Sequence, residues 1–313
     1  MNFQQLRIIR ETVRHNFNLT EAAQALLTSQ SGVSKHIRDL EEELGVEVFI
    51  RRGKRLLGLT DPGREVVAIT ERILLDAENL TRVASQFSRS DEGTLTIATT
   101  HTQARYALPP VIAKFKEIFP NVRLVMNQAS PKAIASMLIE GQTDIGIATD
   151  TLDDQAGILA FPYYSWEHAV VVPEGHPLQS RKKLTLDAIA EWPIITYDEG
   201  LTGRARIDEA FDRAGIIPDM AMSALDADVI KAYVELGLGV GIIASMAFAA
   251  ERDPGLALVS CGHLFDQSTS SIAVRRGRFL RDYVYRFIEL CSPTLTEQTI
   301  KAAAIRHGGG LGE

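Results

Sequence analysis

Residues 19–63 read LTEAAQALLTSQSGVSKHIRDLEEELGVEVFIRRGKRLLGLTDPG and combine a short helix, a longer helix and a basic hairpin. Asn18 can cap the short helix, with Glu21 three residues later as in a capping box. Thr28 or Ser29 can cap the longer helix, which ends at Gly45. One apolar stripe follows the longer helix at helical spacing: Val33, Ile37, Leu40 and Leu44. A short helix joined tightly to a longer one predicts a helix-turn-helix.

The other face of the longer helix carries hydrogen-bonding and cationic side chains and no carboxylate. It comprises Gln30, Ser31, Ser34, Lys35 and Arg38, with Thr28 just before the helix. In a major groove, Gln can pair with adenine, Lys or Arg with guanine, and Ser with bases or phosphates. We therefore predict that this face contacts DNA.

The hairpin VEVFIRRGKRLLGLT, residues 46–60, has the form of a wing. Val46, Val48 and Ile50 alternate as in a strand, and Leu57 and Leu59 begin the return strand. Cations surround the turn at Arg51, Arg52, Lys54 and Arg55, where they can contact DNA phosphates. Taken alone, the helix face and the basic run could each be a solvated surface. Their succession within the first 60 residues favours DNA binding.

The composition, 45% hydrophobic and 23% charged over 313 residues, predicts a soluble chain of two or three domains. Residues 1–60 carry a net charge of +2 and the remaining residues carry −9, which gives the total of −7. The two cysteines form no framework of disulfides or metal ligands. Since neither a signal peptide nor a membrane span is evident, we expect a cytoplasmic protein without membrane contacts.

A long helix is predicted over residues 61–90, with Pro62 in its first turn. Val66, Ile73, Leu80 and Phe87 recur every seven residues, which is the pattern of a seam between two paired helices. The alternative is a helix packed against its own chain. Pairing predicts a homodimer.

From Gly93 onward, apolar strand-like runs alternate with amphipathic helices, which is typical of an α/β domain. Strands at 94–100, 122–127 and 144–149 with helices between them predict a parallel sheet, and a second lobe is expected over about 163–266. Ligands bind beyond the carboxyl ends of such strands, where Thr100, Thr102 and Thr149 lie. The alternative role for these threonines is helix capping.

Several motifs resemble one known family. Four motifs in the first 63 residues resemble the DNA-binding domain of LysR-type regulators. They are the AA pair at 22–23, S-x-x-S-x-x-I-x-x-L-E at 31–41, F-x-R at 49–51 and T-x-x-G at 60–63. Three further stretches resemble the CysB-like subgroup, whose members control sulfur assimilation and the use of alternative sulfur sources. They are IATTHTQARYALP at 97–109, ITY and GLTGR within 195–204, and DADVIKAYVELGLGVGIIAS at 226–245. MNFQQL and RRGKRLLG are closest to its regulators of sulfonate use.

The resemblance implies an α/β fold class: a winged helix-turn-helix at 1–60, a linker helix at 61–90, and a two-lobed, periplasmic-binding-protein-like effector domain at 91–313. The lobes would span about 91–162 with 267–292, and 163–266. The implied effector site comprises Thr100, Thr102, Gln103, Thr149, Trp166 and Thr202.

The implied partners are promoter DNA, a second copy in a homodimer or homotetramer, RNA polymerase, and a small anion. The anion is sulfate, acetylated serine or adenosine phosphosulfate. YYSWEH at 163–168 and YDEGLTGR at 197–204 depart from the subgroup's pattern and leave this choice open.

No enzymatic activity, cofactor or metal is expected. The seven histidines lack metal-ligand spacing, and Gly237, Gly239 and Gly241 do not form a dinucleotide fingerprint. A solute-binding protein or an enzyme on the same lobes is the alternative, but it leaves residues 1–88 without a role.

Overall fold

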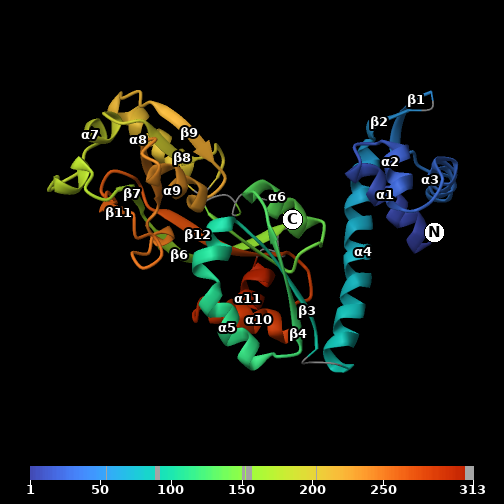
Figure 1. The fold of residues 1–313 in the computed structure, drawn as a ribbon. Coiled ribbons are helices and arrows are strands. Elements are labelled where there is room, and N and C mark those ends of the chain that lie inside the picture. The colour runs from blue at the N-terminus through green and yellow to red at the C-terminus, as the bar shows by residue number, and fades with distance from the viewer. Residues whose placement is uncertain (54, 89–91, 150–151, 153–156, 202, 307–313) are drawn as a thin grey trace. The chain divides into compact units, whose positions relative to one another are not determined.

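The computed structural model of the chain describes residues 1–53, 55–88, 92–149, 152, 157–201 and 203–306 (Figure 1). The chain forms two compact units, residues 1–87 and 88–313. Within these described ranges, no helix is both long enough and apolar enough to cross a membrane.

The first unit is a winged helix-turn-helix followed by a long helix. Its elements are α1 (Phe3–Arg14), α2 (Leu19–Ala25), α3 (Gln30–Leu44), β1 (Phe49–Arg52), β2 (Arg55–Leu59) and α4 (Asp61–Ser88). Asn18 caps α2, Ser29 caps α3, and Gly45 ends α3 in the left-handed conformation, as predicted. Leu6, Ile9, Val33, Ile37 and Leu40 form its core, whereas Leu44 is 39% exposed.

The wing strands differ from the prediction in where they begin and in part of their phase. β1 begins at Phe49, and Val48, Phe49 and Leu56 are buried while Ile50 and Leu57 are exposed. A register shift between Ile50 and Arg51 accompanies the pairing of β1 with β2. Because successive strand residues face opposite sides, a displacement of one residue exchanges the buried and exposed sets.

The T-x-x-G motif joins the wing to α4. The Thr60 hydroxyl donates to the Glu47 carbonyl at 2.5 Å and accepts the Gly63 N–H at 2.9 Å. A β-carbon on Gly63 would lie 2.0 Å from the Val48 carbonyl oxygen, so only glycine allows this approach. The motif therefore fixes the first turn of α4 against the wing.

The first lobe of the second unit is a mixed sheet in the order β4-β3-β5-β12-β6. Its elements are β3 (Gly93–Thr99), η1 (Gln103–Ala107), α5 (Pro109–Ile118), β4 (Val122–Gln128), α6 (Pro131–Ile139), β5 (Ile145–Thr149), β6 (Ile158–Trp166), β12 (Ser268–Arg275), α10 (Asp282–Cys291) and α11 (Glu297–Arg306). β3 pairs in parallel with β4 and β5, which confirms the predicted βαβαβ unit.

The second lobe is a sheet in the order β11-β7-β10-β8-β9. Its elements are β7 (His168–Pro173), η2 (Pro177–Ser180), α7 (Leu186–Ala190), β8 (Ile194–Tyr197), α8 (Arg204–Ala214), β9 (Met220–Ala224), α9 (Ala227–Glu235), β10 (Val240–Ala244), η3 (Ser245–Ala247) and β11 (Leu256–Ser260). Residues 163–166, expected in this lobe, instead belong to the first sheet, because β6 pairs with β12 up to Trp166 opposite Ser268.

Candidate DNA-binding surface and effector site

The predicted DNA-contacting side chains of α3 share one solvent-facing surface. Thr28, Gln30, Ser31, Lys35 and Arg38 are exposed. Ser34 is half-buried, and its hydroxyl accepts a hydrogen bond from Arg38 at 3.4 Å. The structure therefore brings the predicted set together on a helix face that is free to enter a groove.

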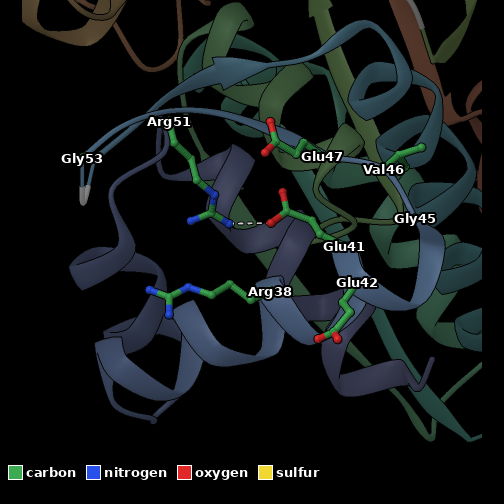
Figure 2. Close-up of a pocket in the computed structure, with 8 residues that line it drawn as sticks. All are labelled: Arg38, Glu41, Glu42, Gly45, Val46, Glu47, Arg51 and Gly53. Carbon is green, nitrogen blue, oxygen red and sulfur yellow. Dashed lines mark hydrogen bonds and ion pairs between the residues drawn. The ribbon is translucent and has the colours of Figure 1, made fainter.

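The wing cations differ in their surroundings, and Figure 2 shows one of them, Arg51, directed at Glu41. Arg52 is exposed, whereas Arg51 donates to the buried carboxylate of Glu41 at 2.5 Å. Glu41 also accepts the N–H groups of Val48 and Phe49 at 2.9 and 3.1 Å. The charge of Arg51 is thus compensated within the domain, and Lys54 lies outside the described residues.

A cavity of about 650 Å³ lies between α3 and the wing. Its lining includes the carboxylates of Glu41, Glu42 and Glu47 as well as Arg38 and Arg51 (Figure 2). Three carboxylates in one groove disfavour an anionic ligand, so the predicted effector site must be sought in the second unit.

Three of the predicted effector residues converge on Ser270. Its buried hydroxyl lies 3.0 Å from Gln103 Nε2, 3.2 Å from Thr149 Oγ1 and 3.2 Å from Trp166 Nε1. The Tyr164 hydroxyl donates to Gln103 Oε1 at 2.6 Å and fixes that amide. The sequence prediction omitted Ser270 and Tyr164, although the hydroxyl-rich run STSS at 268–271 was a signal.

Thr100 lines a cavity of about 310 Å³ with residues from both lobes. The lining comprises Thr100, His101, Gln128, Ala129, Ser130, Leu201, Leu225 and Asp226. Thr100 is 4% exposed, and its hydroxyl has no hydrogen-bond partner among the described residues. Thr102 makes no capping bond, and its side chain lies near the Tyr197 hydroxyl. Neither threonine therefore caps a helix.

The start of α8 approaches the same strand that carries Ser270. Gly203 has φ +71°, and a β-carbon there would lie 2.7 Å from Ser268 Oγ. Ser268 is fully buried, and its hydroxyl also lacks a partner in the described part of the chain. Arg204 is engaged by Asp208 at 2.7 Å and by the Tyr197 carbonyl at 2.6 Å. Thr202 lies outside the described residues.

His101, Asp226 and Asp228 place potential metal-ligand atoms within 4.8 Å of one another. Asp228, however, also lies 3.6 Å from Arg105 Nε and 3.3 Å from Lys231 Nζ. Two cations beside the carboxylate oppose a divalent ion and favour an ion-pair network.

Two family models match the chain. The model described as "Bacterial regulatory helix-turn-helix protein, lysR family" matches residues 3–64, and "LysR substrate binding domain" matches residues 88–296. The matches correspond to the winged helix-turn-helix and to the two lobes.

Several regulators are similar along nearly their full length. SsuR of Burkholderia cenocepacia is 59% identical, with 96% of this chain and 97% of SsuR covered. Cbl of Klebsiella aerogenes is 54% identical, with 97% of this chain and 96% of Cbl covered. CysB of Burkholderia cenocepacia is 53% identical, covering 97% of both chains.

The solved cofactor-binding domain of the Cbl regulator is 48% identical with a TM-score of 0.66. The match covers 68% of this chain and 93% of the solved domain. These relatives confirm the predicted likeness to the CysB-like subgroup, and they are transcription regulators rather than enzymes or solute-binding proteins. The chain therefore belongs to the LysR family of bacterial transcription regulators, with a DNA-binding helix-turn-helix and an effector-binding domain of two α/β lobes.

Proposed function

We propose that this regulator activates genes of sulfur assimilation or sulfonate use in response to a small sulfur-linked anion. The likeness to SsuR, Cbl and CysB along the chain supports this assignment. RNA polymerase is the further partner that activation implies. Because the target is bacterial promoter DNA, we expect the protein to act in the cytoplasm.

For DNA, we propose that the exposed face of α3 reads base edges through Gln30, Lys35 and Arg38. Arg52 and Lys54 are the proposed phosphate contacts of the wing. We assign Arg51 mainly to holding the wing on α3, since Glu41 already compensates its charge. Phosphate contacts provide affinity, whereas base contacts provide sequence choice.

The unpartnered hydroxyl of Thr100 in the inter-lobe cavity carries the effector proposal. A buried hydroxyl without a partner costs about 1–3 kcal/mol, which a bound oxyanion would recover. Ser268 offers a second such hydroxyl next to the uncapped start of α8, where helix N–H groups favour anions. Thr102, Gln103, Thr149, Trp166 and Thr202 complete the proposed site, and sulfate, acetylated serine and adenosine phosphosulfate are the candidate anions.

We further propose a homodimer through α4, and a homotetramer by resemblance to the family. The exposure of Leu80 (73%) and Phe87 (87%) on α4 supports pairing by this helix. The proposed division into residues 1–60, 61–90 and 91–313 follows from these roles.

The test of the effector is calorimetric titration of the full chain with each of the three anions. Thr100→Ala should weaken binding of the cognate anion by about 1–3 kcal/mol. Thr94→Ala is the matched control, since Thr94 is exposed on β3, the strand that Thr100 directly follows. Equal binding by wild type and Thr100→Ala would reject this site.

The test of the regulon is genome-wide footprinting with and without sulfate starvation. Binding sites near genes of sulfur uptake, with an occupancy that changes on starvation, would support the proposal. A footprint confined to unrelated genes would contradict it.

A further inference from the structure

The segment from Thr100 to Ala107 contacts both lobes. It ends in η1, a single turn of π-helix, a rare element that is frequent at functional sites. Gln103 at the start of η1 donates to Ser270 of the first lobe at 3.0 Å. Tyr106, three residues later, packs on a hydrophobic cluster of the second lobe that includes Tyr197 and Ile230. One short segment therefore joins the proposed anion site to the second lobe.

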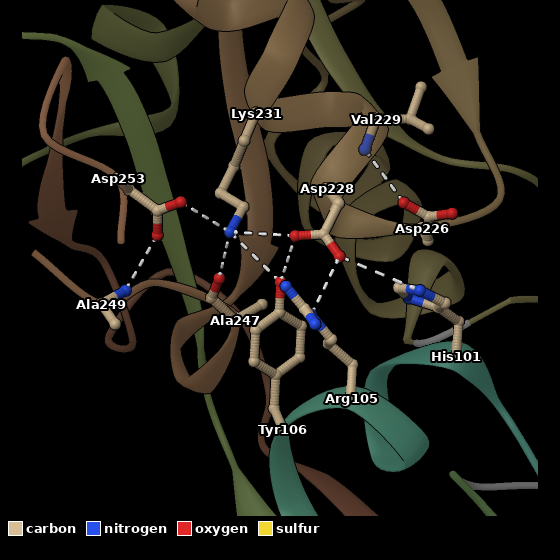
Figure 3. A network of polar contacts seen from close by, with 10 residues as sticks. All are labelled: His101, Arg105, Tyr106, Asp226, Asp228, Val229, Lys231, Ala247, Ala249 and Asp253. Carbon is tan, nitrogen blue, oxygen red and sulfur yellow. Dashed lines mark hydrogen bonds and ion pairs between the residues drawn. The ribbon is translucent and has the colours of Figure 1, made fainter. Parts of the chain in front are cut away.

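The hydroxyl of Tyr106 is held by two charged residues of α9 (Figure 3). It donates to Asp228 Oδ1 at 2.6 Å and accepts from Lys231 Nζ at 3.2 Å. Lys231 is 6% exposed and also donates to Asp253 Oδ1 and to the Ala247 carbonyl, both at 2.9 Å. The buried ammonium is therefore fixed in place, and it fixes the end of the Tyr106 side chain.

The protonation states favour this arrangement at neutral pH. Burial and the hydrogen bond to Asp228 raise the pKa of Tyr106, which stays a neutral donor. Burial acts to lower the pKa of Lys231, but the hydrogen bonds to Asp253 and Tyr106 outweigh it and the net change is upward. Burial acts to raise the pKa of Asp228, but the Tyr106 hydrogen bond and the Lys231 charge outweigh it and the net change is downward.

We infer that Tyr106, Asp228 and Lys231 form a latch between the lobes and act as positioning residues that hold segment 100–107 in its anion-binding arrangement. None of the three belongs to the proposed anion site itself. A ligand loses apparent affinity in proportion to the fraction of molecules that leave the binding-competent arrangement. Opening the latch should therefore weaken anion binding without removing an anion contact. The inference rests on the proposed effector site.

The first test is Tyr106→Phe, which keeps the ring and removes only the hydroxyl that donates to Asp228 and accepts from Lys231. A hydrogen bond to a charged group changes an equilibrium constant by about tenfold or more. We expect the dissociation constant of the cognate anion to rise about tenfold or more. The constant is measured by calorimetry with sulfate, acetylated serine and adenosine phosphosulfate in turn. The matched control is Tyr233→Phe on α9, the helix that carries Asp228 and Lys231, because Tyr233 is exposed to solvent. This control should leave the dissociation constant unchanged.

A double-mutant cycle with Asp228→Asn separates the latch from a general loss of stability. If both residues act through one contact, the loss in the double variant is smaller than the product of the two single losses. Thermal unfolding is measured in parallel. Lowered melting temperatures with wild-type dissociation constants would mean a purely structural role and would reject the inference.

The distance between the lobes provides a readout that needs no ligand. Spin labels at Lys114→Cys and Lys182→Cys report on the first and second lobe, because both positions are exposed. Cys261 and Cys291 are replaced by alanine in all proteins compared. Tyr106→Phe should broaden the distance distribution of the full chain, and Tyr233→Phe should not.

The two readouts distinguish the latch from the proposed function. An unchanged distance distribution in Tyr106→Phe rejects the latch, and so does a changed distribution with an unchanged dissociation constant. If none of the three anions binds the wild-type chain, the proposed effector is wrong. The distance measurement alone then tests the latch. A broadened distribution in Tyr106→Phe supports the latch, and an unchanged distribution rejects it.

Discussion

Glu41 shows how a single carboxylate can connect the recognition helix with the wing. It belongs to the run of three glutamates at the end of α3, yet it turns inward and accepts the N–H groups of Val48 and Phe49 as well as Arg51. Glu42 and Glu43 are exposed. The family motifs L-E and F-x-R therefore describe one contact, in which Glu41 and Arg51 hold the wing in register.

Replacing Glu41 by alanine should loosen the wing. The change leaves two buried N–H groups without an acceptor, and each such group costs about 1–3 kcal/mol. Amide hydrogen exchange at Val48 and Phe49 should become faster in the full chain. Glu42→Ala, one residue along the helix and exposed, is the control. Equal protection of both amides in the Glu41 variant and the control would contradict this role.

The recognition surface should divide into base and phosphate contacts. Lys35→Ala or Arg38→Ala should weaken binding to the specific operator by about 1–3 kcal/mol relative to random DNA. Arg52→Ala should instead weaken binding to all sequences and reduce its salt dependence. The exposed Arg72 of α4 supplies the control, Arg72→Ala. Unaltered operator binding in all three variants would show that the DNA surface lies elsewhere.

The two cysteines should be chemically silent in the folded chain. Burial raises the pKa of both Cys261 and Cys291 to about 12, so at pH 8 only about one thiol in ten thousand is the reactive thiolate. A disulfide-exchange reagent at pH 8 should label neither in the native protein and both after denaturation. Rapid labelling of the native protein would contradict this expectation.

The sequence predicted candidate effector residues at strand ends but not the residue that joins them. Thr100 and Thr149 lie at the ends of strands of a recognisable βαβαβ unit, and Gln103 was implied by the family resemblance. Ser270 comes from β12, which is 167 residues beyond Gln103, and its role depends on β12 pairing with β5. No local pattern contains that pairing. Likewise, the partner of Arg51 could not be read from a run of three similar glutamates.

At the level of elements, helices were predicted more accurately than the wing. α2 and α3 carry their own caps. α5 lies between the predicted strands at 94–100 and 122–127, as expected, and it begins at Pro109 and ends before Pro120. In the wing, apolar residues occupy both members of the pairs Phe49–Ile50 and Leu56–Leu57. Alternation alone cannot choose between two such phases, and tertiary packing selected Phe49 and Leu56 for the core.

The linker helix α4 combines the two roles that the sequence left open. Val66 and Ile73 pack on the core of the DNA-binding domain, as the alternative interpretation expected, whereas Leu80 and Phe87 are exposed. α1 adds an ion pair from Arg10 to Glu78 at 3.3 Å. The first part of the heptad pattern, Val66 and Ile73, thus packs on the domain, and the second part, Leu80 and Phe87, is available to a second helix.

This division predicts different outcomes for two substitutions on one seam. Leu80→Asp should dissociate the proposed dimer, because a charge in an apolar helix interface is costly, while the domain stays folded. Ile73→Asp should mainly lower the melting temperature of the DNA-binding domain. Analytical ultracentrifugation and thermal unfolding of both variants are the measurements. A Leu80→Asp chain with the wild-type sedimentation coefficient would contradict a dimer seam at this position.

At the scale of the whole molecule, we propose that the first unit recognises operator DNA and that the second unit binds a sulfur-linked anion. The charge distribution agrees with this division, since the basic residues of the first 60 positions include the exposed Lys35, Arg38 and Arg52, while the rest of the chain is acidic. The anion can change DNA binding only through a difference in its affinity for two arrangements of the chain. The proposed site between two lobes is suited to produce such a difference.

The most direct test is a footprint of the operator by the full chain with and without the cognate anion. We expect the anion to change the wild-type footprint. Thr100→Ala should give the wild-type footprint without anion and require a higher anion concentration for the change, by about five- to 150-fold for a loss of about 1–3 kcal/mol. A Thr100→Ala chain that responds at the wild-type concentration would show that the anion does not bind at Thr100. A wild-type footprint unaffected by every candidate anion would show that none of these anions controls DNA binding.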